Sequence, residues 1–308
     1  TLSDLNPLIA AAHEKSIPVI VDAAWGGHFG FHPDLPAHVI AQGADALVTS
    51  VHKALPGYSA SALLLATTKF ISAERLEQSF ETTHTTSPAG APLASIDAVR
   101  ALLQTRGAEL LGELIENVAQ FKLAVQANFD LPIFLNPSDF PAGRFDPAKI
   151  VLRVQQLGAA GVEIERALIA QGFRVEMADN DTIVFLATLA DTKEDFQALA
   201  MTVVPILKKL QNAQRQSATA LSWSVVPQIA TSMRDAYFAK TEMVGASDAI
   251  GRISADLIAP YPPGVAVVAP GEVLTEQIVT GLSASQKAGV RIAYATDPSL
   301  KSYRVVKK

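Results

Sequence analysis

The stretch Ile17-Pro-Val-Ile-Val-Asp22 begins a series of three apolar runs, and the other two are Ala44-Asp-Ala-Leu-Val-Thr49 and Ser61-Ala-Leu-Leu-Leu-Ala66. Each run is short, rich in aliphatic side chains and followed by turn-forming or polar residues, a pattern typical of buried strands. A glycine-containing loop, Trp25-Gly-Gly-His-Phe-Gly30, follows the first run. Apolar strands separated by loops and helices predict an α/β fold with a buried, largely parallel sheet.

Helical patterns surround these runs. Apolar residues repeat at helical spacing over residues 5–12, behind Ser3 as the expected N-cap. A short helix is expected after Pro36 and before Gly43. Residues 68–129 are expected to be helical, with an interruption at residues 87–92. A single apolar stripe marks the second half of this segment: Leu110, Leu114, Val118, Phe121 and Val125.

Prolines and polar stretches divide the chain. Pro132, Pro137 and Pro141 gather before Gly143, which is the strongest boundary signal in the sequence. We expect a large domain over residues 1–135, a small α+β domain over 136–215 and a C-terminal domain over 220–308, with residues 211–219 as a linker. Strands are expected over residues 150–154, 173–177 and 182–187, and helices over 162–170, 193–210, 246–253 and 275–282.

Composition limits the function. The 308 residues are 49% hydrophobic and 18% charged, which excludes disorder as the main state and suits roughly two average domains. The absence of cysteine excludes disulfides and thiolate sites and agrees with a cytoplasmic location. A net charge of -5 argues against a nucleic-acid partner, and no apolar run is long enough to predict a membrane span. Because the chain begins at Thr1 without a signal peptide, we expect it to start inside a longer protein.

The segment Ser50-Val-His-Lys53 ends the second run and carries the main chemical signal. A lysine at the end of a buried strand is unusual, and a desolvated amine becomes a nucleophile toward carbonyls. The alternative is a loop lysine whose ammonium reaches solvent.

Asp22 ends the preceding run, and alone it could be a helix cap or a turn acid. Paired with Lys53 it indicates a pyridoxal phosphate site, because that cofactor needs an acid at its pyridinium nitrogen and a lysine at its aldehyde. Adjacent strand ends in an open α/β sheet can face one ligand.

Other motifs carry less weight. Ser50 to Lys53 also matches S-x-x-K, but the companion motifs S-D-N and K-T-G are absent. His28 and His32 have the spacing of a helical metal pair, yet the surrounding glycines make a helix there improbable, so no metal is expected. The sequence contains neither a dinucleotide fingerprint nor a P-loop.

Several segments are collinear with a known family. They are Val21-Asp-Ala-Ala-Trp-Gly-Gly-His-Phe-Gly-Phe-His-Pro33, Gly43-Ala-Asp45, Thr49-Ser-Val-His-Lys-Ala-Leu-Pro56, His84-Thr-Thr-Ser-Pro88, Ser95-Ile-Asp-Ala-Val-Arg100, Arg234-Asp-Ala-Tyr-Phe238, Gly251-Arg-Ile-Ser-Ala-Asp256, Pro260-Tyr-Pro-Pro-Gly-Val265 and Pro270-Gly-Glu272. Together they resemble the bacterial ornithine/lysine/arginine decarboxylases, pyridoxal-phosphate enzymes of the aspartate-aminotransferase fold. The resemblance implies a large α/β domain, a smaller α+β domain and a C-terminal α/β segment.

The resemblance also implies residue roles. Lys53 would hold pyridoxal 5'-phosphate as a Schiff base, and Asp22 would bind its ring nitrogen. Around the cofactor, Ala24 would pack on the ring, Trp25 would reach the ring hydroxyl, and Ser50 and His52 would lie at the phosphate. Lys53 or His52 would return a proton to the substrate. Thr86 and Ser87 would reach the site of a partner subunit, and Glu272 would contact the far cationic end of the substrate. For Glu272 the alternative is an acid near the start of a helix.

The chain departs from the family in two ways. Many relatives read Asp-Glu-Ala-His where this sequence has Asp22-Ala-Ala-Trp25, which leaves the subgroup and substrate open. The glycine/serine phosphate loop and the ring-stacking histidine that relatives place before the aspartate are not found in the residues before Asp22.

Three functions follow from the resemblance. The first is decarboxylation of arginine, lysine or ornithine by a dimer or higher homo-oligomer. The second is another lyase or an aminotransferase of the same fold, for which Arg252 and Arg291 are candidate carboxylate ligands. The third is a degenerate or truncated paralogue that only dimerises or regulates. The presence of both Asp22 and Lys53 speaks against it, whereas the absence of the phosphate loop before Asp22 speaks for it.

Overall fold

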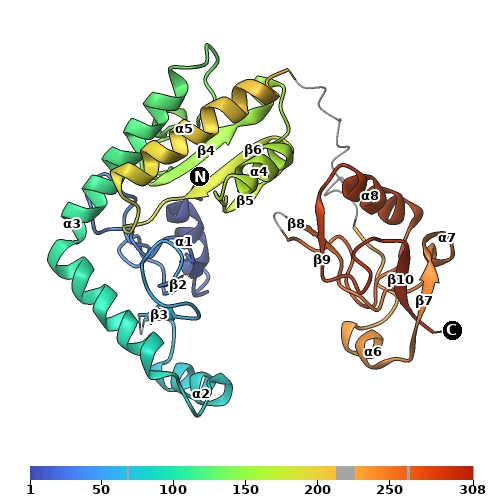
Figure 1. The fold of residues 1–308 in the computed structure, drawn as a ribbon. Coiled ribbons are helices and arrows are strands. Elements are labelled where there is room, and N and C mark those ends of the chain that lie inside the picture. The colour runs from blue at the N-terminus through green and yellow to red at the C-terminus, as the bar shows by residue number, and fades with distance from the viewer. Residues whose placement is uncertain (68, 213–225, 262–263, 308) are drawn as a thin grey trace. The chain divides into compact units, whose positions relative to one another are not determined.

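The computed structural model describes residues 1–67, 69–212, 226–261 and 264–307 (Figure 1). The chain forms two compact units, one of Thr1–Arg153 and Val184–Ile206 and the other of Val154–Ile183 and Leu207–Lys308. The expected linker at 211–219 and the turn at 261–264 lie partly outside the described residues. The three domain limits stay a prediction.

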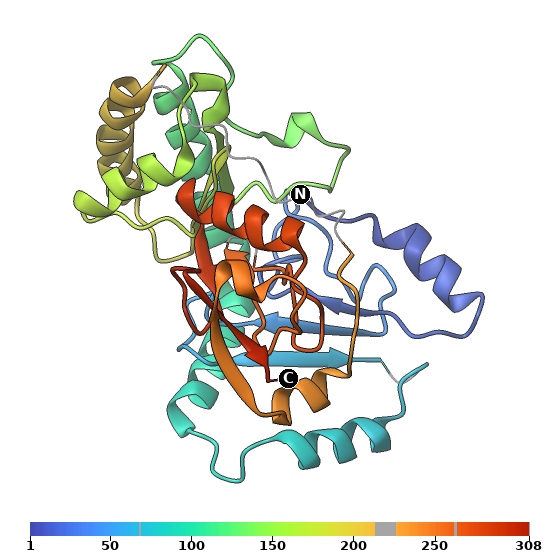
Figure 2. The same cartoon turned by 90° about the vertical axis from the view of Figure 1, so that its right-hand side faces the viewer.

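Three strands form the first sheet, in the order β1, β2, β3. β1 (Ile20–Asp22) runs parallel to β2 (Ala46–Ser50), and β3 (Ala62–Ala66) is antiparallel to β2. Figure 2 shows them side by side as blue arrows. The three predicted strands are confirmed, but a parallel arrangement is wrong for β3. The loop at 51–61 contains no helix and is shorter than the dozen or more residues that a parallel crossover needs.

This sheet is less buried than the apolar runs predict. α1 (Leu5–His13) packs on one face, where Ile9 and Leu47 share a small core. Ile20 of β1 is 65% exposed and Leu64 of β3 is 47% exposed. The expectation of strands buried throughout is therefore wrong, because apolar composition records a preference for burial and not whether a covering element is present.

Two helical expectations near this sheet are also wrong. The N-cap of α1 is Asp4 rather than Ser3, since Asp4 Oδ1 accepts a hydrogen bond from the Asn6 N–H at 3.3 Å. Residues 33–43 form turns instead of a helix. Here His32 Nδ1 accepts from the Asp34 N–H, and side-chain bonds of this kind compete with helix formation.

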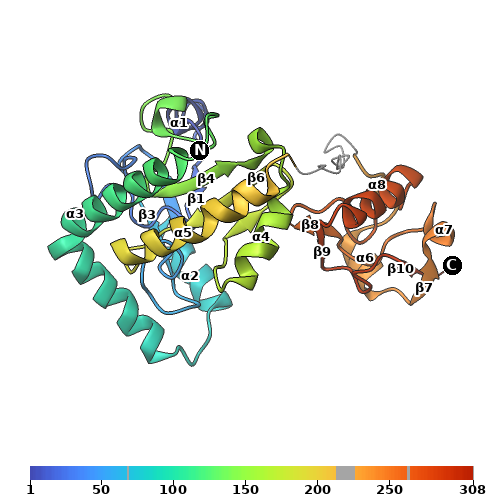
Figure 3. The same ribbon diagram turned by 45° about the horizontal axis from the view of Figure 1, so that its top comes forward.

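Helices frame the rest of the first unit. They are α2 (Ala73–Thr83), α3 (Gly90–Gln126) and α5 (Lys193–Leu210). Figures 1 and 3 show α5 lying along α3, and the ring centroids of Phe121 and Phe196 are 6.1 Å apart. The predicted stripe on α3 is confirmed, with Leu114, Val118, Phe121 and Val125 buried and Leu110 half-buried.

A second three-stranded sheet has the order β4, β6, β5. β4 (Lys149–Arg153) and β6 (Thr182–Leu186) lie close to the predicted limits, whereas the strand predicted at 173–177 is wrong except at Met177, where β5 (Met177–Ala178) begins. α4 (Gly161–Ala170) agrees with the predicted helix at 162–170. Two 3-10 helices complete this part of the chain, η1 (Pro137–Asp139) and η2 (Val154–Leu157).

The C-terminal part has its own core. Its elements are α6 (Met233–Phe238), β7 (Thr241–Gly245), α7 (Ala246–Ala249), β8 (Ala259–Tyr261), α8 (Glu276–Lys287), β9 (Arg291–Ala293) and β10 (Ser302–Val306). β7 pairs with β10 and β8 with β9, both antiparallel. The buried cluster includes Ile258, Leu274, Ile278 and Tyr303. The helix predicted at 246–253 is a single turn, because Ile253 pairs in a β-bridge with Val273.

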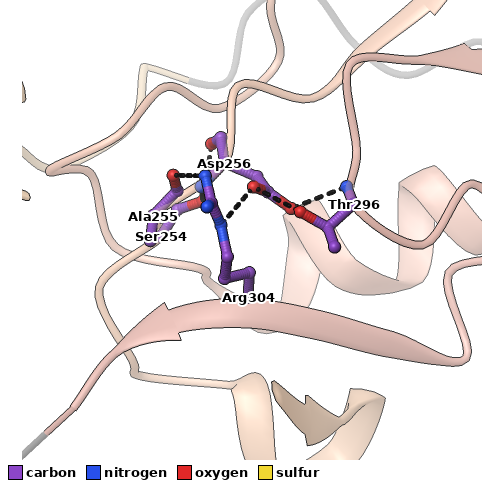
Figure 4. Close-up of polar contacts among 5 residues, drawn as sticks. All are labelled: Ser254, Ala255, Asp256, Thr296 and Arg304. Atoms are coloured by element: carbon purple, nitrogen blue, oxygen red, sulfur yellow. Dashed lines mark hydrogen bonds and ion pairs between the residues drawn. The ribbon is translucent and has the colours of Figure 1, made fainter. Parts of the chain in front are cut away.

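The segment Gly251–Asp256 that matched the family serves this core. Asp256 is 4% exposed and accepts hydrogen bonds from Arg304 Nε at 2.7 Å and from the Thr296 N–H at 2.8 Å (Figure 4). Arg304 also donates to the Ala255 carbonyl at 2.9 Å. The motif therefore ties β10 to the loop before β8, and it carries no sign of a ligand site.

Among the described residues no helix is both long and apolar enough to cross a membrane. The same part of the chain contains no group of three or more metal-ligating side chains.

Candidate active site

Asp22 and Lys53 belong to the same edge of the first sheet. β1 and β2 are parallel, and Asp22 is in register with Val48, so the carboxyl ends of both strands meet there. The Ala23 N–H extends this pairing by donating to the Val48 carbonyl at 2.8 Å. Asp22 Oδ1 accepts from the Ala24 N–H at 3.0 Å, and the residue is exposed. The carboxylate is therefore accessible from solvent at the sheet edge.

The loop after β1 is fastened to the end of β2. Thr49 Oγ1 donates to the Ala23 carbonyl at 2.9 Å, and the Ser50 N–H donates to the Ala24 carbonyl at 3.4 Å. A side chain at Gly27 would place its Cβ 3.1 Å from Thr49 Oγ1 and 3.3 Å from the Ser50 carbonyl oxygen. Glycine at this position lets the two backbones approach closely.

Lys53 lies on the turn between β2 and β3. The Gly57 N–H donates to the Val51 carbonyl at 2.9 Å, which closes this turn. A Cβ at Gly57 would stand 2.6 Å from the same carbonyl oxygen, so the turn requires glycine. The Lys53 side chain is half-buried, and within the described residues its ammonium has no hydrogen bond or ion pair.

His52 is held by the neighbouring strand. Its Nδ1 donates to the Ser61 carbonyl at 2.8 Å, which fixes the neutral ring with its proton on Nδ1 and its lone pair on Nε2. Ser50, at the end of β2, is half-buried beside it in the sequence. These two residues therefore belong to the same strand end as Lys53.

The remaining predicted residues lie elsewhere. Thr86 and Ser87 are exposed on the loop between α2 and α3. Glu272 belongs to the other unit, where its Oε2 accepts from the Ala269 N–H at 2.7 Å. No hydrogen bond among the described residues joins Thr86 or Ser87 to Lys53, so the roles of these three residues stay predictions.

Sequence reasoning missed a buried polar group next to Trp25. Asp146 is 4% exposed and accepts a hydrogen bond from His28 Nε2 at 3.0 Å. Lys149 Nζ lies 3.4 Å from the same carboxylate and 6.0 Å from the centroid of the Trp25 ring. The available signal was the pair of charges, Asp146 and Lys149, directly before the apolar run of β4.

Two parts of the chain match models of one protein family. The family model "Orn/Lys/Arg decarboxylase, major domain" matches residues 1–139, and "Orn/Lys/Arg decarboxylase, C-terminal domain" matches residues 209–292. The chain belongs to the Orn/Lys/Arg decarboxylase family. The resemblance found in the sequence is thereby confirmed.

Individual proteins similar to this chain support the same family assignment. An arginine decarboxylase of Bacillus anthracis is 30% identical over 99% of this chain, and the match covers 63% of that protein. Lysine decarboxylase A from Pseudomonas aeruginosa has the same fold, with a TM-score of 0.75 at 19% identity over 94% of this chain and 54% of its own. Ureidoglycine-glyoxylate aminotransferase from Bacillus subtilis matches with a TM-score of 0.52 at 16% identity over 70% of this chain and 58% of its own. The chain thus spans less than two thirds of the length of these relatives.

The donor groups at the sheet edge fit pyridoxal phosphate. The cofactor requires a carboxylate for its ring nitrogen and a lysine amine for its aldehyde. Asp22 supplies an exposed carboxylate and Lys53 an amine without a partner in the described structure. Asp22 is the last residue of β1, and Lys53 lies on the turn three residues after β2, which runs parallel to β1.

Proposed function

We propose that this protein decarboxylates a basic amino acid, arginine, lysine or ornithine, to the corresponding amine with pyridoxal 5'-phosphate bound at Lys53. The observation that carries the proposal is the shared sheet edge of Asp22 and Lys53, in a chain of the Orn/Lys/Arg decarboxylase family. When bound, the cofactor supplies an electron sink for the carbanion that remains after carbon dioxide leaves.

The protein side chains divide the remaining tasks. Asp22 holds a proton on the ring nitrogen, which increases the electron-withdrawing power of the ring. The Lys53 amine would hold the cofactor at its aldehyde and, when free, would carry a proton to the substrate carbon. His52 is a second candidate for that transfer, through a proton that Nε2 would first have to accept, since Nδ1 is committed to Ser61.

The cofactor is further held by the loop after β1 and the end of β2. Ala24 packs on the ring and Trp25 reaches the ring hydroxyl. Ser50 and His52 bind at the phosphate, where an anion needs several donors. Thr86 and Ser87 act in the site of a second copy in a homodimer or larger assembly.

Arginine is the first substrate to test, because the relative that matches over 99% of this chain is named an arginine decarboxylase. Glu272 is proposed to bind the distal cation of the substrate, although its Oε2 also anchors its own loop through Ala269. An aminotransferase has less support. Arg252 donates to Glu242 at 2.6 Å and to the Val306 carbonyl at 2.9 Å, so it is already engaged within its own unit.

The test is carbon dioxide release by the complete protein with pyridoxal phosphate and each of the three amino acids. We expect release with arginine, and none from the Lys53→Ala variant. Glu272→Gln keeps the hydrogen bond to Ala269 but removes the charge, so it should raise KM and leave the fold intact. Amino-group transfer to a keto acid, without carbon dioxide release from any of the three, contradicts the proposal.

A further inference from the structure

A buried ion cluster joins the loop after β1 to the segment that leads into β4. His28 is 1% exposed, Asp146 is 4% exposed and Lys149 is 8% exposed. His28 Nε2 and Lys149 Nζ lie 3.0 and 3.4 Å from Asp146 Oδ2. Asp146 Oδ1 accepts from the Ala148 N–H at 3.0 Å, so both carboxylate oxygens are engaged.

The Asp146 carboxyl group favours its ionised form despite its burial. Burial acts to raise the pKa of Asp146, but the hydrogen bond from His28 and the charges of His28 and Lys149 outweigh it, so the pKa is lowered. Lys122 is a further buried cation whose charge interacts with Asp146. His28 Nδ1 is buried without a hydrogen-bond partner among the described residues.

Stability alone is a poor reason for such a cluster. Apolar residues of similar size often replace buried ion pairs without loss of stability, and a buried nitrogen without a partner is unfavourable. The cluster is therefore better explained by a role in holding neighbouring side chains in position. Among the groups near the cluster is Trp25, since Lys149 Nζ lies 6.0 Å from the centroid of that ring. This distance is the outer limit of a cation–π contact.

The cluster holds the Trp25 loop at two points. His28 is three residues after Trp25 on the same loop and binds Asp146 directly. Lys149 approaches the indole from β4. We propose that Lys149 is a positioning residue for Trp25, with its ammonium held in place by Asp146 and His28. This inference rests on the proposed function, in which Trp25 contacts the ring of pyridoxal phosphate.

The test uses the fluorescence of Trp25 in the complete protein, with every other tryptophan replaced by Phe. Within this chain that requires only Trp223→Phe, since the sequence has two tryptophans. Lys149→Met keeps the length of the side chain and removes the cation. We expect a shift of the Trp25 emission without cofactor, stronger quenching by acrylamide, and a dissociation constant for pyridoxal phosphate raised about 3- to 10-fold. Lys149→Arg restores the cation and should return all three quantities toward the parent values.

An exposed ion pair provides the matched control. Arg100 donates to Asp97 at 2.8 Å on the surface of α3, and Arg100→Met removes one cation there without an effect on Trp25. If Lys149→Met fails to fold, Asp146→Asn keeps the shape of the acid, removes its charge, and should shift the Trp25 emission in the same way.

The outcomes separate the two claims. A Lys149→Met protein with lower thermal stability but unchanged Trp25 emission and cofactor affinity overturns the inference, because the cluster is then structural only. A shifted emission in a protein whose parent form does not bind pyridoxal phosphate supports the positioning of Trp25 and contradicts the proposed function instead.

Discussion

Lys122 lies on α3 with only 8% of its surface exposed. Its ammonium donates to the Leu135 carbonyl at 3.3 Å and lies 5.2 Å from the centroid of the Phe145 ring. Burial lowers the pKa of Lys122 from 10.5 to about 8, against the opposing charges of Asp146 and Asp139. The protonated side chain therefore destabilises the fold at neutral pH.

Replacement of Lys122 by Met should stabilise the protein. Because the unfolded chain binds more protons than the folded one between pH 8 and 10.5, the stability of the parent protein rises with pH through that window. Lys122→Met should raise the free energy of unfolding by about 1–3 kcal/mol at pH 7, and the gain should shrink toward pH 10.5. Urea unfolding at several pH values measures this, with the exposed Lys193→Met as control. A loss of stability at pH 7 would show that the bond to Leu135 outweighs the cost of burial.

Single residues also show which parts of the site can be predicted from the sequence. Asp22 and Lys53 could be chosen as candidates because one ends an apolar run and the other closely follows one, and such a position is a local pattern. The partner of His28 could not, since Asp146 is 118 residues away and no local pattern records that contact. The same reason explains why the sequence did not single out Lys149.

At the scale of elements, Gly57 decides whether the turn after β2 can form. Its missing Cβ would lie 2.6 Å from the Val51 carbonyl oxygen, which is closer than any real Cβ contact. That carbonyl also accepts the hydrogen bond that closes the turn around Lys53. A side chain at this position must therefore displace the residues next to Lys53.

Gly57→Ala should accordingly weaken both the fold and the site. We expect a loss of about 1–3 kcal/mol in the free energy of unfolding, typical of overpacking, and a higher dissociation constant for pyridoxal phosphate. Gly90→Ala is the control, since a Cβ at Gly90 meets no atom within 4 Å. Equal cofactor affinity in the Gly57→Ala and parent proteins would mean that the turn does not position Lys53.

The helices and strands also show which elements the periodicity of apolar residues can predict and which it cannot. The long helices were predicted well, because α3 and α5 repeat their apolar residues over many turns. The antiparallel direction of β3 was missed, although the short loop at 51–61 could have indicated it. β8 and β9, of three residues each, are too short to show a periodicity. β7 and β10 were also not predicted.

At the scale of the whole molecule, the C-terminal core is self-contained. All residues of its buried cluster and of the side chains packed against it lie between Val244 and Val305. A core drawn from one continuous segment can fold without the rest of the chain. The C-terminal family model, which matches residues 209–292, covers most of the same segment.

An isolated fragment of residues 226–308 should therefore fold. We expect a cooperative thermal transition with an unfolding enthalpy of about 60 kcal/mol near 60 °C. Leu274→Ala, at a fully buried position, should lower its free energy of unfolding by about 2–5 kcal/mol. Circular dichroism and calorimetry measure both quantities. A fragment without a cooperative transition would show that this core depends on residues outside it.

The most direct measurement of the central claim is reduction of the complete protein with borohydride in the presence of pyridoxal phosphate, followed by peptide mapping. The account predicts that the reduced cofactor is attached to Lys53, on the turn that follows β2, and that Lys53→Ala abolishes the attachment. Asp22→Ala should retain the attachment while slowing carbon dioxide release. Stoichiometric attachment at any other lysine, with Lys53 unmodified, would contradict the account.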